Sequence, residues 1–221
     1  MQSYYITERR QFAGSETERR ARLLQTIGKA SAAGVDYIQL REKDLTIREL
    51  ERLAAEALRV MRGEGTSRLL INHRTDVALA VGADGVHLTS EDIAASEARA
   101  LAAKVRTERF LIAASCHSTQ EVRLAESHGA DFVVLAPVFE KRGMNGIGVQ
   151  VLREAAQKDR TPDTRVEAGD TRRRFAVFAL GGVNMERAPL CAAAGAAGIA
   201  GIRLFQQCED LPGLVRAIRE L

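Results

Sequence analysis

Short apolar segments alternate along the chain with longer amphipathic ones. The short segments are rich in Val, Ile and Leu, whereas the longer ones space Ala, Leu, Arg and Glu as a surface helix does. The pattern predicts eight strands, at residues 3–7, 35–42, 68–72, 85–89, 110–115, 131–137, 175–182 and 198–203. It predicts helices at residues 16–33, 46–61, 74–81, 92–104, 119–128, 149–158, 185–194 and 209–221.

Glycine marks the end of several predicted helices. Gly34, Gly82, Gly129 and Gly195 each stand shortly before a predicted strand, where a helix end favours a residue in the left-handed conformation. Eight strand–helix units in 221 residues favour a closed parallel sheet, the (β/α)8 or TIM barrel, over an open doubly wound sheet. We expect a single α/β barrel domain over the whole chain, with a polar loop insertion at about residues 158–174.

Composition narrows the class of protein further. The chain has 32 Lys and Arg against 29 Asp and Glu, and this net charge of +3 forms no basic stripe, so no nucleic acid partner is expected. Cys116, Cys191 and Cys208 are widely spaced and form no metal-binding motif, which favours reduced thiols. No segment resembles a signal peptide or approaches the ~20 apolar residues of a membrane span. We expect a cytoplasmic protein without a membrane partner, and the sequence does not decide whether it forms a homo-oligomer.

Polar residues gather where the predicted strands end. The carboxyl ends of all strands in a parallel barrel open on one face, so these residues should converge. Alternation along the second strand puts Gln39, Arg41 and Lys43 on one side, with Leu40 and Glu42 on the other. An inward amide beside two cations suggests a site for a polyanion such as a diphosphate.

Oxygen-bearing side chains follow the next three strands. Asn72 and Asp92 would present an amide and a carboxylate at neighbouring loops, and Mg²⁺ accepts one or two carboxylates together with phosphate oxygens and water. A second interpretation of Asp92, as an acid in the first turn of the following helix, stays open. Ser115, at the end of the fifth strand, would donate to a substrate or diphosphate oxygen.

The last three strands end in glycines and cations. Gly181 and Gly182 follow the seventh strand and Arg203 follows the eighth, which is where barrels of this kind commonly bind phosphate through backbone N–H groups. Lys141 and Arg142 begin a glycine-rich segment after the sixth strand. That segment is consistent either with closure over an anion or with a simple connection.

Two other polar groups are given structural interpretations. Cys116 and His117 are adjacent, so in a strand they point to opposite faces and are poorly placed to act as a catalytic dyad. Cys116 is expected in the core. His87 lies in the middle of a predicted strand and is also expected to be structural.

Several of these segments resemble a known family. YIQLREKD, LLINHRTDVALAVGADGVHLTSED, GADFVVLAPVF, FALGGV and GAAGIAGI occur in order over most of Tyr37–Arg203. Together they resemble the thiamine-phosphate synthases and their thiazole tautomerase relatives. The resemblance implies a (β/α)8 barrel and a transferase that joins hydroxymethylpyrimidine diphosphate to hydroxyethylthiazole phosphate, with diphosphate as the leaving group and Mg²⁺ as cofactor.

The resemblance also implies roles for individual residues. The pyrimidine diphosphate would be bound by Gln39, Arg41, Lys43 and Asn72, with Ser115 and Lys141 on the diphosphate. The thiazole phosphate would be bound by Gly182, Ile202 and Arg203. Arg41, Lys43, Ser115 and Lys141 would also act in catalysis, and Asp92 would ligate Mg²⁺.

Three positions depart from the family pattern. His73 stands where the synthases usually carry a second Mg²⁺-binding Asp, and an imidazole is a poor partner for Mg²⁺. Phe139-Glu140-Lys141-Arg142 replaces an expected Thr-x-Thr-Lys loop, so Lys141 is the natural substitute for the lost contacts, and Arg203 replaces a Ser. Two alternatives therefore stay open: a thiazole tautomerase, although Ala136 and Pro137 occupy the positions of its expected acid/base His, and a non-catalytic phosphate-binding barrel.

Overall fold

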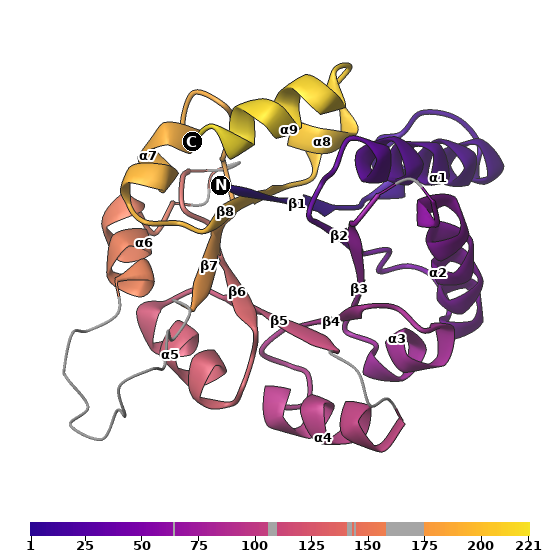
Figure 1. The fold of residues 1–221 in the computed structure, drawn as a ribbon, viewed down its shortest axis with the longest axis horizontal. Helices are drawn as coiled ribbons and strands as arrows, with labels where there is room; N and C mark the ends of the chain where they lie inside the picture. The colour runs from indigo at the N-terminus through magenta and orange to yellow at the C-terminus, as the bar shows by residue number, and fades with distance from the viewer. Residues whose placement is uncertain (64, 106–109, 141–142, 144, 158–174) are drawn as a thin grey trace.

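The computed structural model describes residues 1–63, 65–105, 110–140, 143, 145–157 and 175–221. Eight parallel strands close into a barrel in chain order, each hydrogen-bonded to the next and β8 to β1, with the helices outside (Figure 1). The strands are β1 Gln2–Ile6, β2 Tyr37–Leu40, β3 Arg68–Asn72, β4 Gly85–Leu88, β5 Leu111–Cys116, β6 Phe132–Leu135, β7 Ala176–Ala179 and β8 Gly198–Gly201. The predicted TIM barrel is confirmed.

The outer layer follows the predicted helices closely. It contains α1 Glu16–Ala32, α2 Ile47–Met61, α3 Thr75–Val81, α4 Ala95–Val105, α5 Thr119–Ser127, α6 Val149–Ala156, α7 Ala188–Ala193 and α9 Leu211–Arg219. Two short helices were not predicted: a 3₁₀ turn, η1 Arg9–Gln11, and α8 Arg203–Gln206. None of the helices in the described part of the chain combines the length and the apolar character needed to cross a bilayer.

Local signals in the sequence explain where the helices start and stop. Ser15 and Thr46 each begin a helix with a capping box, in which the side chain and a Glu three residues later bond each other's backbone N–H. The helix-ending glycines have the expected left-handed backbone, Gly82 for example with φ 71°. The predicted boundaries of α1 and α2 are therefore nearly those observed.

Three aspartates tie the amino ends of the strands together. Asp36, Asp84 and Asp131 precede β2, β4 and β6, and each carboxylate accepts a hydrogen bond from the backbone N–H of a residue in the neighbouring strand, at 2.6–2.9 Å. These carboxylates lie at the opposite end of the barrel from the strand ends that carry the predicted site, so they stabilise the fold rather than bind substrate.

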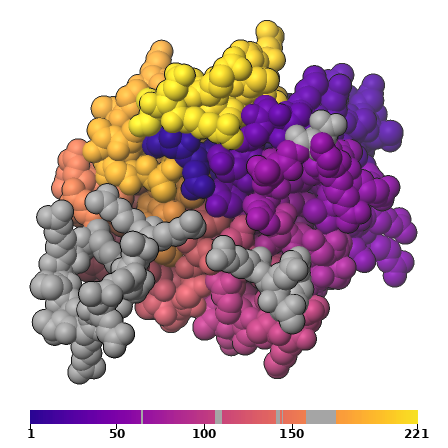
Figure 2. Space-filling model, viewed as in Figure 1, coloured from indigo at the N-terminus to yellow at the C-terminus, as the bar shows by residue number. Residues whose placement is uncertain are grey.

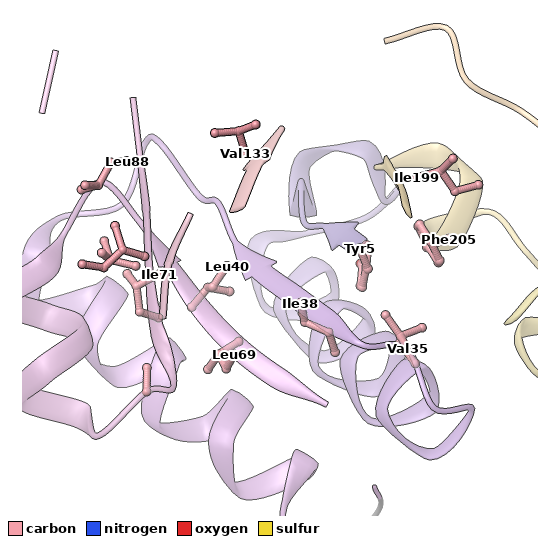
Figure 3. Packing of buried hydrophobic residues seen from close by; sticks show 14 of the residues in the cluster. Tyr5, Val35, Ile38, Leu40, Leu69, Ile71, Leu88, Val133, Ile199 and Phe205 are labelled. Carbon is pink, nitrogen blue, oxygen red and sulfur yellow. The ribbon is translucent and has the colours of Figure 1, made fainter. Parts of the chain in front are cut away.

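Side chains alternate between two apolar clusters on either side of the sheet. Tyr5, Ile38, Leu40, Leu69 and Ile71 belong to the outer cluster, between the strands and the helices (Figure 3). The inner cluster fills the barrel with aromatic rings, whose centroids lie 4.8–5.9 Å apart, contributed by Tyr4, Tyr37, Phe132 and Phe178. In the space-filling view, seen from the same side as Figure 1, atoms fill the centre of the molecule (Figure 2). The barrel is a packed core rather than a pore.

The main error in the predicted elements concerns the carboxyl ends of strands. Strands predicted to end at 42, 182 and 203 end at Leu40, Ala179 and Gly201. The segments that follow are loops although their sequence still alternates. After β7 the loop stays bonded to its neighbour, with Leu180 N donating to Leu135 O at 3.0 Å and Phe139 N donating to Gly181 O at 3.0 Å. Among the described residues expected to bind substrate, Arg41, Lys43, Gly182 and Ile202 therefore lie in loops, and Arg203 begins α8.

Candidate active site

The innermost part of the site is a layer of hydrogen-bonded polar side chains above the aromatic rings. Gln39 on β2 and Asn72 on β3 are both buried, and Nε2 of Gln39 donates to Oδ1 of Asn72 at 2.8 Å. Alternation therefore places both amides inside the barrel at its carboxyl end, as expected. The bond leaves Oε1 of Gln39 and Nδ2 of Asn72 as an acceptor and a donor for a flat polar ring.

The two predicted cations lie on the loop that follows β2. Arg41 is partly buried, and its Nη1 lies 3.5 Å from Oε2 of Glu8. Lys43 is exposed and lines a pocket of about 310 Å³ together with Asn72, His73 and other residues. Because β2 ends at Leu40, strand alternation does not govern Lys43, and it reaches the same rim from a loop.

A buried ion-pair network, missed in the sequence, holds this loop in place. Glu42 is buried, accepts a hydrogen bond from Thr7 Oγ1 at 2.7 Å, and pairs with Nη1 of Arg9 at 3.0 Å. Arg9 also forms a two-pronged pair with Asp44, at 2.7 and 2.9 Å. Burial raises the pKa of Glu42, whereas the hydrogen bond from Arg9 lowers the pKa of Asp44. The Glu42 carboxylate, which also accepts from the backbone N–H of Arg9, thus ties the segment between Arg41 and Lys43 to the loop after β1.

Asp92 is held by the loop between β4 and α4. Its Oδ2 accepts hydrogen bonds from Thr89 N at 2.7 Å and Thr89 Oγ1 at 3.1 Å, and its Oδ1 lies 2.8 Å from Nδ1 of His73. The interpretation of Asp92 as a first-turn helix acid is wrong, because α4 starts only at Ala95 and the carboxylate binds back to Thr89 in the preceding turn. Its oxygens face the loop after β3, as a rim ligand requires.

His73 has an unusual backbone conformation. Its φ of 64° is the only positive value of a non-glycine residue in the described part of the chain. This left-handed turn directs the imidazole toward Asp92 rather than toward the barrel interior. Among the described residues no group of three or more His, Cys, Asp or Glu side chains is arranged to hold a metal ion. Any metal at Asp92 would need ligands from water or substrate.

Ser115 is joined to a buried histidine. Its Oγ lies 2.8 Å from Nε2 of His87 on β4, and Nδ1 of His87 lies 2.8 Å from the hydroxyl of Tyr4 on β1. Burial lowers the pKa of His87 to about 3, so the ring is neutral near pH 7. The sequence predicted that His87 is structural and provided no sign of its contact with Ser115.

Cys116 and His117, next along the chain, face away from this chain of contacts. Cys116 is buried in the outer core, and burial raises the pKa of its thiol to about 12. His117 is exposed, and its Nδ1 lies 2.6 Å from the backbone oxygen of Ala136. The predicted position of Cys116 in the core is confirmed.

A second pocket, of about 110 Å³, opens at the ends of β7 and β8. It is lined mostly by glycine and apolar residues: Gln11, Leu180, Gly181, Gly182, Val183, Ala200, Gly201, Ile202, Arg203 and Leu204. A Cβ on Gly182, where φ is 64°, would lie 2.9 Å from the backbone oxygen of Glu140. Glycine at 182 is thus required by close packing between the loops after β6 and β7.

Arg187 is a cation on the β7 side of the barrel mouth that the sequence analysis did not single out. Its Nη1 donates to the backbone oxygen of Gly182 at 2.9 Å, and its guanidinium lies over the Phe139 ring, 5.0 Å from the centroid. Neither contact follows from a sequence motif. Lys141, Arg142 and the predicted loop insertion at 158–174 lie outside the described residues.

These features gather buried polar side chains, cations and glycine-rich loops at the carboxyl rim of an α/β barrel, which is where enzymes of this fold carry their active sites. The family model described as thiamine monophosphate synthase matches residues 4–205. The chain belongs to this family, whose members are transferases of thiamine biosynthesis.

Individual relatives agree with this assignment. The chain is 40% identical over 218 residues to a putative thiamine-phosphate synthase of Geobacter sulfurreducens, covering 99% of the chain and 92% of the relative. It is 36% identical over 205 residues to putative thiamine-phosphate synthase 2 of Aquifex aeolicus, covering 91% and 96%. Among solved structures, thiamine phosphate pyrophosphorylase from Pyrococcus furiosus superposes with a TM-score of 0.75 at 28% identity, covering 99% of this chain and 94% of that one.

Proposed function

We propose that this chain is a thiamine-phosphate synthase, which condenses hydroxymethylpyrimidine diphosphate with hydroxyethylthiazole phosphate and releases diphosphate. The observation that carries the proposal is the family match over residues 4–205 combined with the inward Gln39–Asn72 pair at the carboxyl rim. The amide pair offers one donor and one acceptor to a pyrimidine. Because β2 and β3 lie across the closed barrel from β7, the pocket at the ends of β7 and β8 lies opposite them on the rim, as two substrates that react with each other require.

The proposal assigns the two substrates to different sides of the rim. Gln39 and Asn72 would hold the pyrimidine. Arg41, Lys43, Ser115 and Lys141 would hold its diphosphate. Gly182, Ile202 and Arg203 would hold the phosphate of the thiazole, with Ile202 closing the pocket next to its ring.

The reaction needs electrostatic help at the leaving group. The bond between the pyrimidine methylene carbon and the diphosphate oxygen breaks, and the thiazole nitrogen donates its electron pair to that carbon. Negative charge grows on the departing diphosphate, so Arg41 and Lys43 would lower the barrier by neutralising it. Arg41 would exchange its 3.5 Å contact with Glu8 for the diphosphate. No proton has to be removed from either substrate at this step, so no general base is required.

Asp92 is the proposed residue for Mg²⁺. Its Oδ2 is held by Thr89, whereas its Oδ1 contacts only His73 among the described residues, so one carboxylate oxygen is open to a metal that displaces the imidazole. A single carboxylate fits Mg²⁺ when substrate phosphate and water complete its shell. When bound, Mg²⁺ would add positive charge at the diphosphate. Replacing Asp92 with Ala should remove or weaken the dependence of turnover on Mg²⁺, and unchanged dependence would contradict this role.

One incubation tests the proposed reaction. Purified protein is mixed with hydroxymethylpyrimidine diphosphate, hydroxyethylthiazole phosphate and Mg²⁺, and both diphosphate and thiamine phosphate are quantified. Equal amounts of the two products are expected. Interconversion of thiazole isomers without diphosphate release would replace the proposal with a tautomerase, and binding without turnover would replace it with a sensor.

We also propose that the enzyme acts in the cytoplasm. Cys116, Cys191 and Cys208 are all free thiols, and such thiols are typical of reducing compartments. The absence of a nucleic acid partner stays a prediction, and whether the chain forms a homo-oligomer stays open.

A further inference from the structure

A continuous line of hydrogen-bonding groups runs from the floor of the barrel to its rim. It joins Tyr4 on β1, His87 on β4 and Ser115 on β5, with 2.8 Å between Tyr4 Oη and His87 Nδ1 and 2.8 Å between His87 Nε2 and Ser115 Oγ. Tyr4 is 0% exposed and His87 is 2% exposed, whereas Ser115 is partly open at the rim. A neutral imidazole carries one N–H and one acceptor nitrogen, so these distances leave two possible directions for the protons.

The surroundings of Tyr4 decide between the two directions. If Nδ1 of His87 carried the proton, it would donate to Tyr4, and the tyrosine hydrogen would need a different acceptor. The Tyr4 ring is packed against Tyr37, Phe132 and Phe178, with centroids 5.8–5.9 Å away, and its hydroxyl has no other hydrogen bond among the described residues. A buried hydroxyl without an acceptor is unfavourable. Tyr4 therefore donates to Nδ1, and the His87 proton is on Nε2.

The direction of this chain determines what Ser115 offers to a substrate. With Nε2–H donating to Oγ, the serine oxygen is the acceptor in that bond, and its own hydrogen is free to point toward the mouth of the barrel. The opposite direction would direct the serine hydrogen at His87 and leave only oxygen lone pairs facing an anion. Only the first arrangement makes Ser115 a donor to a diphosphate oxygen.

We propose that Tyr4 and His87 are positioning residues that hold Ser115 as a hydrogen-bond donor to the diphosphate. The inference rests on the proposed function, because Ser115 is assigned to the diphosphate there. The two residues act through Ser115 and do not touch substrate. His87 is not a base that activates Ser115 as a nucleophile, because burial lowers the pKa of its imidazole to about 3.

The main test replaces Tyr4 with Phe, which removes one hydroxyl and keeps the ring packing. Tyr5→Phe is the matched control. Tyr5 is equally buried on the same strand, but it points to the outer core, where its hydroxyl donates to Gln206 Oε1 at 3.0 Å. Without the Tyr4 hydroxyl the imidazole is free to take its other tautomer, and the affinity for inorganic diphosphate, measured by calorimetry, should fall about tenfold. Tyr5→Phe should leave that affinity unchanged.

A double-mutant cycle separates positioning from a general effect on the fold. In a Ser115→Ala background, Tyr4→Phe should cause no further loss of diphosphate affinity, because the group through which it acts is gone. An equal loss in both backgrounds, or lower thermal stability with unchanged affinity, would overturn the proposal. Failure of the wild-type protein to bind diphosphate would overturn it as well.

Nitrogen-15 NMR of the imidazole provides a readout that does not depend on turnover. The wild-type spectrum should show His87 in the Nε2–H tautomer, and a predominant Nδ1–H tautomer would contradict the proposed direction. A protein with the expected tautomer and diphosphate binding, but no synthase activity, would refute the proposed function and leave this inference standing.

Discussion

The two sides of the barrel mouth are built from different kinds of group. On the side of β2 to β5, buried side chains form the site: Gln39 bonds Asn72, and His87 supports Ser115. On the side of β7 and β8, the pocket is lined mostly by glycine and apolar residues, with Gly182 packed against the loop after β6. Both lie on one rim of the same closed sheet.

This difference matches the two kinds of group that the proposed reaction uses. Side-chain amides distinguish the donor and acceptor edges of a ring, so one side suits the pyrimidine. Backbone N–H groups bind a phosphate where glycine leaves them accessible. They hardly distinguish one phosphorylated molecule from another. Substitutions on the two sides should therefore affect different substrates.

The largest effect is expected from Lys43→Ala. Loss of a cation at the leaving group should lower kcat by about 100-fold or more, because charge develops there in the transition state. Lys43 is exposed, so thermal stability should barely change. Steady-state kinetics and thermal denaturation check this, with exposed Lys104→Ala on α4 as the control. A loss of kcat equal to that of the control would exclude Lys43 from the leaving-group site.

Gly182→Ala should act on the other substrate. An added Cβ at φ 64° would lie 2.9 Å from both Glu140 O and Phe139 Cβ, so the loop must shift. We expect the KM for thiazole phosphate to rise about tenfold while that for pyrimidine diphosphate stays within about twofold. Gly82→Ala, at φ 71° at the end of α3 with no described atom within 4 Å of the added Cβ, controls for backbone strain alone. Equal changes in both KM values would contradict the assignment of the two substrates to different sides of the rim.

His87 should make stability depend on pH. Its pKa is about 3 in the folded protein, below the ordinary value of 6.5, so the unfolded chain binds the extra proton first as the pH falls. Its contribution should therefore be present above pH 6.5 and decline toward pH 3, by about 1.4 kcal/mol at pH 5.5. Denaturant unfolding at pH 7.5 and 5.5 measures this loss. His87→Gln should reduce the pH dependence, with exposed His128→Gln as the control, and an unchanged dependence would refute the buried neutral ring.

The smallest effect is expected from His73→Asp. It would place a second carboxylate beside Asp92, and Asp tolerates the left-handed conformation that His73 has, with φ of 64°. The Mg²⁺ concentration for half-maximal activity should fall about threefold. Calorimetry with Mg²⁺ and diphosphate provides an independent measurement. If the wild-type chain instead reached half-maximal activity at a lower Mg²⁺ concentration than this variant, His73 would support the reaction in another way.

Much of the site was predictable because it depends on strand order and alternation. Gln39 and Asn72 are two residues of an alternating pattern at the ends of neighbouring parallel strands, so their convergence follows from the barrel alone. The role of Glu42 was not predictable in the same way. Its partners Thr7 and Arg9 come from the loop after β1, and no local pattern indicates that contact.

The sequence by itself determined the alternation of strands and helices, the helix starts at Ser15 and Thr46, and the glycine turns, because these depend on interactions between residues close along the chain. Only the tertiary structure decided that Asp92 binds back to Thr89 and toward His73, and that Tyr4, His87 and Ser115 form one line. Those three residues lie 83 and 28 positions apart along the chain. Closure of the barrel brings them together, because inward side chains of different strands meet at the same depth only when the sheet curves onto itself.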